Sequence, residues 1–321
     1  GLFFVLVFED LSRLTAAGVR AMFYRPEIGR FHLRRHRLRR LHRKLVVIDA
    51  RLAFVGGINV IDDNNAPPEM RPDYDYAVRV EGPVLRPMHH AVRRMWETVS
   101  WVHFKRRFRL APVAEPCCAI AGTQQAGFLI RDNIRHRNDI LHAYLHAIDN
   151  AKHSILIANA YFLPGIRFGR ALYAAAQRGV KITVLLQGKS DHQLLRYATQ
   201  TLYATALQAG IRIFEYEKSF MHAKVAVIDG EWATVGSSNI DPFSLLMAKE
   251  ANLVVRDTGF AGELESSLRS AMADGAREMV AEELSRQPLH SRFLRWLAYG
   301  LVRAMVGIAG YSHRHWHTTE T

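Results

Sequence analysis

Short apolar runs alternate with longer amphipathic stretches along most of this chain. Apolar runs bounded by polar residues predict buried strands, and they occur at 3–10, 153–165 and 182–191. The stretch at 167–180 has the apolar spacing of a helix, and Gly179 is suited to cap its C-terminal end. Because strands alternate with helices, the pattern predicts an α/β fold.

An internal repeat organises the chain. Residues 42–59 (HRKLVVIDARLAFVGGIN) align with residues 222–239 (HAKVAVIDGEWATVGSSN), and nine of the eighteen positions are identical. The two motif segments are 180 residues apart. Upstream, residues 16–24 resemble residues 208–216, which are 192 residues apart, so the first repeat has twelve extra residues. These extra residues coincide with an arginine-rich run at 30–44. The sequence therefore contains two copies of one structural unit.

The repeat defines the expected domains. The first repeat takes in residues 1–110 and the second residues 128–280, and a linker at 111–127 with prolines, glycines and no clear period joins them. The counterparts of the strand at 153–165 and of the helix after it would lie before residue 1. We therefore expect the first repeat to lack its opening strand and helix.

Each copy of the repeat carries a histidine, a lysine and an aspartate at the same spacing. Residues two apart on a strand point to the same face, so His42 projects with Lys44, and His222 projects with Lys224. The apolar runs that follow predict strands that hold each pair rigidly, as catalysis by positioning requires. These strands end at predicted hairpin turns that carry the two aspartates, Asp49 and Asp229.

Glycines and polar side chains follow each turn. Such residues allow close backbone approach and supply amide or hydroxyl donors for phosphate oxygens. They are Gly56, Gly57, Asn59, Ser237, Ser238 and Asn239. A single His-x-Lys is commonly a surface feature, but a matched second copy makes coincidence remote. The pattern therefore favours an anionic phosphodiester as substrate.

The amino-acid composition indicates an anionic partner. The 321 residues carry a formal charge of +13 and have a pI near 10.0, which fits either nucleic acid or an anionic membrane surface. The two cysteines are sequence neighbours, so they form no disulfide framework, and a cytosol-facing location is the default. The tail histidines at 313, 315 and 317 have no acidic or cysteine neighbours, so we predict no metal site.

The two motifs resemble the phospholipase D superfamily pattern H-x-K-x4-D-x6-G-(G/S)-x-N. This resemblance implies two α/β repeats, each a mixed β-sheet flanked by helices, packed face to face around one shared active site. It implies no metal and no other cofactor. One histidine would attack phosphorus while the other protonates the departing alcohol. The implied catalytic residues are His42, Lys44, Asp49, His222, Lys224 and Asp229.

The same resemblance implies an acidic partner that fixes the tautomer of each histidine. Asp75 and Glu250 are the candidates, because each heads a further apolar strand at a similar position in its repeat. The two motif lysines, with Asn59 and Asn239, would stabilise charge on the non-bridging oxygens.

Longer segments, among them 75–83 (DYAVRVEGP) and 159–165 (NAYFLPG), are similar to bacterial cardiolipin synthases, closest to the B-type branch. This similarity implies transfer of a phosphatidyl group from one phospholipid to the headgroup hydroxyl of phosphatidylglycerol, with release of a small alcohol. It implies anionic phospholipids as partners, with phosphatidylethanolamine as a candidate donor. It also implies a peripheral location on the cytoplasmic face of the cell membrane.

The C-terminal stretch at 286–311 fits a membrane-associating amphipathic tail. Its part at 293–311 is apolar and aromatic, but Arg295 and Arg303 interrupt it, which favours an interfacial helix over a spanning one. The arginine-rich run would add attraction to anionic headgroups. The alternatives are a tail helix packed on the catalytic core and an arginine-rich helix face in solvent.

Three other functions stay open at the level of sequence. A hydrolytic phospholipase D would use water as the acceptor with the same intermediate. A superfamily nuclease would suit the basic charge, but the apolar tail and the scarcity of aromatic residues in the arginine-rich run disfavour nucleic acid. A non-catalytic membrane-binding protein is disfavoured because both motifs are intact.

Overall fold

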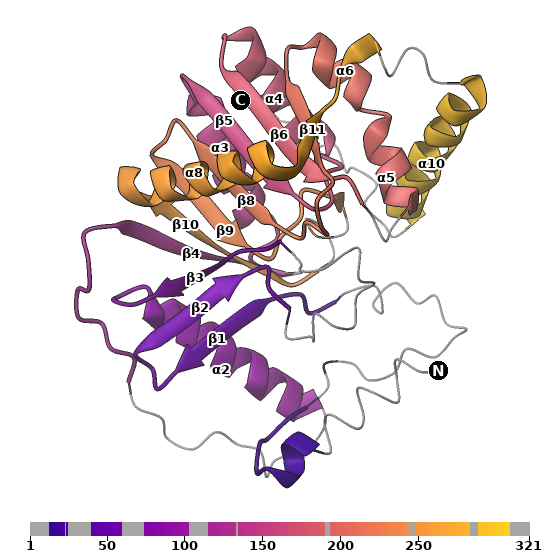
Figure 1. The fold of residues 1–321 in the computed structure, drawn as a ribbon. Helices are drawn as coiled ribbons and strands as arrows, with labels where there is room; N and C mark the ends of the chain where they lie inside the picture. Colours follow the sequence, from indigo (N-terminus) through magenta and orange to yellow (C-terminus); the bar gives the residue numbers. More distant parts are fainter. Residues whose placement is uncertain are drawn as a thin grey trace, which may run out of the picture.

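The computed structural model in Figure 1 describes the following residues: 13–22, 24, 40–59, 74–102, 115–132, 134–189, 193–242, 244, 248–282 and 288–308. Four features of the sequence lie outside the described residues. They are the predicted strand at 3–10, most of the arginine-rich run, the first part of the linker and the tail histidines.

The larger of two sheets has eight strands in the order β11-β7-β6-β5-β8-β9-β10-β4. In chain order they are β4 (Gln125–Arg131), β5 (Ser154–Asn159), β6 (Lys181–Gln187), β7 (Arg212–Tyr216), β8 (Lys224–Ile228), β9 (Trp232–Gly236), β10 (Glu250–Arg256) and β11 (Ala276–Glu278). β5, β6 and β7 are parallel and the other neighbours are antiparallel, so the sheet is mixed.

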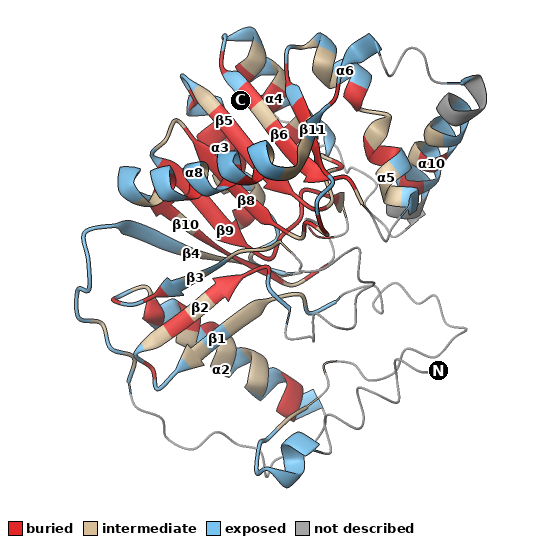
Figure 2. Ribbon diagram, in the orientation of Figure 1, coloured by how far each residue is buried: buried red, intermediate tan, exposed pale blue. Residues whose placement is uncertain are grey.

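Helices cover both faces of this sheet, because its strands are apolar on both sides. On β5, Ile155 and Ile157 face a core shared with α3 and α4, whereas Leu156 and Ala158 face a second core under α8. This is the two-residue period expected of a strand. Figure 2 shows the buried strands between helices whose outer faces are exposed. The helices are α3 (Asp139–Asn150), α4 (Ile166–Gln177), α6 (Tyr203–Gln208) and α8 (Thr258–Gly275).

The predicted glycine cap of α4 is confirmed. Gly179 has φ +86, a conformation that glycine adopts without steric cost. Its N–H donates to the carbonyl of Ala176 at 2.9 Å, and the next N–H, of Val180, donates to the carbonyl of Ala175 at 3.1 Å. These two bonds form a Schellman motif, which ends the helix and turns the chain into β6.

The smaller sheet belongs to the first repeat. It has three antiparallel strands in the order β1-β2-β3, and the helix α2 follows it. These elements are β1 (Lys44–Ile48), β2 (Leu52–Gly56), β3 (Ala77–Val80) and α2 (Leu85–Val102). The described strands of this sheet contain no parallel pair, whereas the second repeat has the mixed sheet that we expect.

The motif aspartates lie at the hairpin turns that the sequence predicts. Asp49 and Ala50 have φ of 50 and 54, and Asp229 and Gly230 have φ of 53 and 66. Two consecutive residues with positive φ form the type I′ turn that suits the twist of a two-stranded hairpin. Aspartate tolerates this conformation better than most residues. The two hairpins, β1-β2 and β8-β9, therefore have the same local geometry.

The two repeats pack face to face through a common apolar core. Ala53 and Val55 of β2 and Leu85 of α2 meet Ala251 and Leu253 of β10 in this core. β4, which pairs with β10, begins at Gln125, inside the range that the sequence assigns to the linker. The predicted architecture of two repeats is thus observed.

The C-terminal helix α10 (Leu289–Ile308) packs beside α5 (Gln193–Gln200). Ala298 and Val302 are buried against it, and the hydroxyl of Thr201 donates to the carbonyl of Arg295 at 3.1 Å. The opposite face of α10 is exposed and apolar, with Phe293, Leu294, Trp296, Leu297 and Leu301. Part of the tail thus packs on the catalytic core, and part of it faces outward.

The residues around Gly236, at the end of β9, leave no room for a Cβ atom at this position. A Cβ atom at Gly236 would lie 2.2 Å from Cγ of Asn252 and 2.6 Å from the carbonyl oxygen of Ala251. We predict that Gly236→Ala lowers the free energy of unfolding by about 1–3 kcal/mol in urea titrations. Gly127→Ala is the control, because no atom lies within 4 Å of its Cβ position. Equal effects of the two substitutions would contradict this explanation.

Candidate active site

The two motif histidines lie next to each other between the repeats. Their ring centroids are 6.5 Å apart, with the rings at 75°. The backbone just before β1 is bonded to the second repeat, since the N–H of His42 donates to the carbonyl of Lys249 at 2.9 Å. Correspondingly, the N–H of His222 donates to the carbonyl of Tyr74 in the first repeat at 2.8 Å. Backbone bonds between the repeats therefore fix both histidines.

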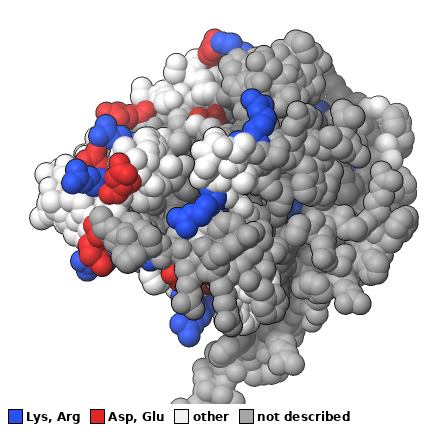
Figure 3. Space-filling model, turned by 90° about the horizontal axis from the view of Figure 1, so that it is seen from below, with Lys and Arg blue, Asp and Glu red and all other residues white. Residues whose placement is uncertain are grey.

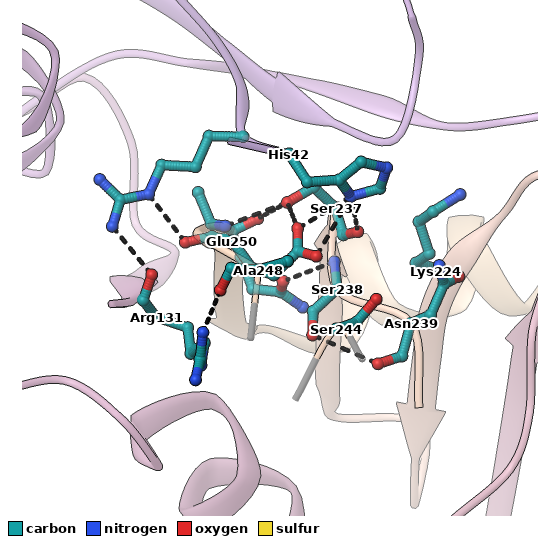
Figure 4. A network of polar contacts seen from close by, with 12 residues as sticks. His42, Arg131, Lys224, Ser237, Ser238, Asn239, Ser244, Ala248 and Glu250 are labelled. Atoms are coloured by element: carbon teal, nitrogen blue, oxygen red, sulfur yellow. Dashed lines mark hydrogen bonds and ion pairs between the residues drawn. The ribbon is translucent and has the colours of Figure 1, made fainter. Parts of the chain in front are cut away.

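Each histidine takes its carboxylate partner from the other repeat. Nδ1 of His42 lies 3.0 and 3.1 Å from the two carboxylate oxygens of Glu250, and Nδ1 of His222 lies 2.8 Å from Oδ2 of Asp75. The sequence indicates these two acids as partners from their positions within the repeats, but it does not show that the pairs are exchanged. Figure 4 shows His42 meeting Glu250, with Lys224 and Asn239 beside them.

These contacts set the tautomers of the histidines. A carboxylate accepts hydrogen bonds, so Nδ1 of each ring carries the proton and Nε2 keeps its lone pair. Burial lowers the pKa of His222, and the hydrogen bond to Asp75 opposes this effect. The side chain of His222 is 11% exposed and that of His42 is 29% exposed. His222 is thus held neutral in the drier of two similar environments.

The motif lysines supply positive charge at the same place. Lys224 is fully buried and its ammonium donates to the carbonyl of His222. Burial lowers the pKa of Lys44 to about 8 and that of Lys224 to about 7. The carboxylates of Asp75 and Glu250 partly counteract this effect for both lysines. A bound phosphodiester would counteract it further, because an anion favours the charged ammonium.

The residues after the two hairpins have a different task from the one that the sequence indicates. The N–H groups of Gly57 and Ser237 bond to strand carbonyls, and the hydroxyl of Ser237 donates to Glu250 at 2.5 Å. A Cβ atom at Gly57 would lie 2.3 Å from Oδ1 of Asp75, and one at Gly56 would lie 2.1 Å from a backbone oxygen. Gly57 and Ser237 thus accommodate the carboxylates, and Gly56 makes room for the neighbouring backbone.

The two motif asparagines and Ser238 are placed differently. Asn239 and Ser238 are buried, whereas Asn59 is exposed. The N–H of Ser238 lies 3.4 Å from the side-chain oxygen of Asn252. Of the two predicted phosphate-binding amides, the structure therefore brings only Asn239 into the buried site.

The predicted catalytic role of Asp49 and Asp229 does not fit their positions. Each aspartate follows the far end of the strand that begins with its motif lysine. The carboxylate of Asp229 accepts three backbone N–H bonds, all at 2.8 Å, from residues 152–154. Burial alone would raise the pKa of Asp229, but these bonds outweigh it and hold the pKa below its usual value. Asp229 thus anchors the hairpin to the start of β5.

Two residues near the site have no signal in the sequence. Arg43 donates to the carbonyls of Glu250 and Arg131, both at 3.0 Å, and so ties the first repeat to β10 and β4. The side-chain oxygen of Gln187 accepts from the N–H of Met221, next to His222. The second repeat has Ala223 where the first has Arg43, so comparison of the repeats does not indicate this role.

The exchange of carboxylates has a direct spectroscopic consequence. Asp75→Asn removes the negative charge that stabilises the imidazolium of His222, so we predict that the pKa of His222 falls further below its ordinary value. An NMR titration of the histidine side chains measures this. Glu250→Gln is the matched control and should perturb His42 instead. The opposite pattern would show that the partners belong to the same repeat.

Comparisons with known proteins show the family to which the chain belongs. The family model described as "Cardiolipin synthase, PLD-like domain" matches residues 144–272. Cardiolipin synthase B of Escherichia coli O6:H1 (strain CFT073) is 36% identical over 317 residues, which cover 96% of this chain and 74% of that protein. Cardiolipin synthase A of Pseudomonas entomophila (strain L48) is 33% identical over 255 residues, or 76% of this chain and 50% of that protein.

A solved structure supports the fold independently. Phosphatidylserine synthase from Haemophilus influenzae Rd KW20 superposes with a TM-score of 0.60 at 11% sequence identity, covering 84% of this chain and 70% of that one. At this identity the likeness concerns the fold alone, and the family rests on the sequence relatives. The chain belongs to the cardiolipin synthase family of the phospholipase D superfamily.

Proposed function

We propose that this protein transfers a phosphatidyl group from one phospholipid to the headgroup hydroxyl of phosphatidylglycerol, through a phosphohistidine intermediate. The observation that carries the proposal is the pair of histidines, each bonded through Nδ1 to a buried carboxylate, with ring centroids 6.5 Å apart. A phosphorus atom between the rings would be within reach of both Nε2 atoms.

In the first step, Nε2 of one histidine attacks phosphorus and forms an N–P bond. The bond from phosphorus to the departing headgroup oxygen breaks, and the other histidine, which enters this step as an imidazolium, gives that oxygen the proton on its Nε2. The released product is a small alcohol. The carboxylate partner of each ring stabilises the imidazolium without taking its proton, as in a serine protease triad.

In the second step, the histidine that gave up its proton takes one from the hydroxyl of phosphatidylglycerol. The resulting alkoxide attacks phosphorus, the N–P bond breaks, and the new diester is cardiolipin. One phosphodiester replaces another, so the reaction needs no nucleotide. Lys44 and Lys224 stabilise charge on the non-bridging oxygens in both steps.

A cavity beside the site supports a lipid substrate. It has a volume of about 660 Å³ and lies between α2 and β4, and its lining includes Met95, Val99 and Phe128. Its charged lining residues are of both signs, with Arg43 and Lys249 on one side of the balance and Asp132 and Asp139 on the other. On the one face that Figure 3 shows, the described basic and acidic side chains likewise lie among one another. The apolar part of the lining suits the acyl chains of a lipid.

The histidines provide the first test. We predict that His42→Ala and His222→Ala each lower kcat by at least about 10⁴-fold, because one site needs both a nucleophile and an acid. His146→Ala, an exposed histidine on α3, is the control and should keep full activity. The assay uses labelled phosphatidylglycerol in vesicles, with and without phosphatidylethanolamine, and resolves the products.

The product identifies the reaction. Cardiolipin supports the transferase, and dependence on phosphatidylethanolamine would identify the donor. Phosphatidic acid alone would indicate a hydrolase. Full activity of either histidine variant would refute the mechanism with two histidines. Acid quenching of the two variants also shows which histidine carries the phosphatidyl group.

We further propose that α10 holds the protein at the membrane surface. Within the described part of the chain, no helix is long and apolar enough to cross a membrane. The exposed face of α10 carries Phe293 and Trp296, whose rings stack at 6.1 Å, and Arg303 flanks this face. Neighbouring α5 exposes Leu194 and Tyr197. Aromatic and aliphatic side chains flanked by arginine are typical of a helix in a lipid interface.

A pair of tryptophans tests the membrane surface. Trp296 on α10 is 64% exposed, and Trp101 on α2 is 79% exposed. We predict that Trp296→Ala weakens binding to vesicles that contain phosphatidylglycerol by about tenfold, because a buried large apolar side chain contributes roughly 1.5–3 kcal/mol. Trp101→Ala should change binding little. Vesicle flotation compares them, and an equal loss in both variants would argue against α10 as the docking surface.

A further inference from the structure

Asn159 lies at the C-terminal end of β5, next to the predicted phosphate site. In the pairing of β5 with β8 it stands opposite Lys224. Opposite residues of an antiparallel pair have their side chains on the same face, so the amide of Asn159 lies beside the Lys224 side chain. In the sequence, Asn159 is the polar end of a predicted strand.

The orientation of this amide is fixed by its oxygen. Oδ1 of Asn159 accepts from the N–H of Ile240 at 3.1 Å, and Ile240 directly follows Asn239. The Asn159 side chain is therefore held between Lys224 and Asn239, two residues to which we assign the non-bridging oxygens of the substrate. Because Oδ1 is bonded on this side, the amide nitrogen points the other way.

The amide nitrogen is buried and has no hydrogen-bond partner among the described residues. Asn159 is 0% exposed, and Nδ2 makes no hydrogen bond there. A buried donor without a partner typically costs about 1–3 kcal/mol. By contrast, both side-chain polar atoms of the buried Asn252 have hydrogen-bond partners. Its Oδ1 faces the N–H of Ser238, and its Nδ2 donates to Thr234 at 3.2 Å. Oδ1 of Asn239, like Nδ2 of Asn159, is buried without a partner among the described residues, so two unpaired polar atoms lie at the predicted phosphate site, where a ligand could satisfy them.

We infer that Nδ2 of Asn159 donates a hydrogen bond to a non-bridging oxygen of the phosphodiester. This inference rests on the proposed function, because it adds a further contact to the same site. The amide contributes a neutral donor beside the lysine cation, and it does not lose its proton at any pH at which the protein is folded. Oδ1, held by Ile240, keeps the donor aimed before the substrate arrives, which is the arrangement that stabilises developing charge.

The sharpest variant is Asn159→Asp. It retains an oxygen for the N–H of Ile240 and nearly the same volume, but it replaces the donor with a second oxygen. Loss of one such donor typically lowers the rate by about 10²–10³-fold, so we expect kcat/KM for phosphatidyl transfer to fall by at least about 100-fold. Asn159→Ser, which is too short to make both contacts, should lose at least about tenfold, and it replaces the aspartate variant if that protein does not fold.

The matched control is Thr234→Val on β9. Its hydroxyl is buried and donates to the carbonyl of Leu253 at 2.8 Å, away from the histidines. This substitution removes two buried hydrogen bonds of the same sheet, to Leu253 and from Asn252, so it should lower the free energy of unfolding and leave kcat/KM within threefold of the wild type. The Asn159 variants should show the reverse pattern, a small change in stability with a large loss of activity.

Binding of orthovanadate separates this inference from the proposed function. Vanadate mimics a phosphate, and its binding to the full chain does not require any lipid to react. We expect its Kd to rise at least tenfold in both Asn159 variants and to stay unchanged in Thr234→Val, measured at pH 6 so that Lys224 stays charged. If vanadate binds both Asn159 variants as tightly as the wild type, the inference is wrong. A wild type that binds vanadate but transfers no phosphatidyl group would refute the proposed function and leave Asn159 as a phosphate contact.

Discussion

The exchange of carboxylates between the repeats is the constraint on which the rest of the site depends. Glu250 is fully buried, and a buried carboxylate is stable only when charged or polar groups surround it. Those groups are His42 from the other repeat and the hydroxyl of Ser237. In the same way, Asp75 of the first repeat is bonded to His222 of the second. Neither repeat can therefore complete its own half of the site, and the packing that joins the repeats also creates the chemistry.

The two halves of the site are related but not identical. The first repeat pairs a short acid, Asp75, with Gly57, and a side chain on that glycine would collide with the carboxylate. The second pairs a longer acid, Glu250, with Ser237, whose hydroxyl occupies one carboxylate oxygen. The proposed mechanism gives the two histidines different roles, and the two acids give them different surroundings. The histidine rings also differ in exposure: His222, which pairs with Asp75, is less exposed than His42, which pairs with Glu250.

The fold also links the site to a surface that suits lipid. β6 ends at Gln187, which bonds the backbone beside His222, and α5 begins shortly after it. α10 packs on α5 with one face and exposes aromatic side chains on the other. α5 and α10 are thus connected to the site through the end of β6, next to the backbone that carries His222.

The sequence alone determined the duplication, the α/β class, the hairpins at the two motifs, the glycine cap of α4 and the family, because each of these leaves a local pattern or a repeated one. It also indicated both acids, Asp75 and Glu250. Only the tertiary structure decided which acid serves which histidine, because these partners are 208 and 147 residues apart and a local pattern carries no information across such distances. For the same reason only the structure showed that Asp229 anchors a hairpin, that Gly57 makes room for a carboxylate, and that the amide of Asn159 stands beside Lys224.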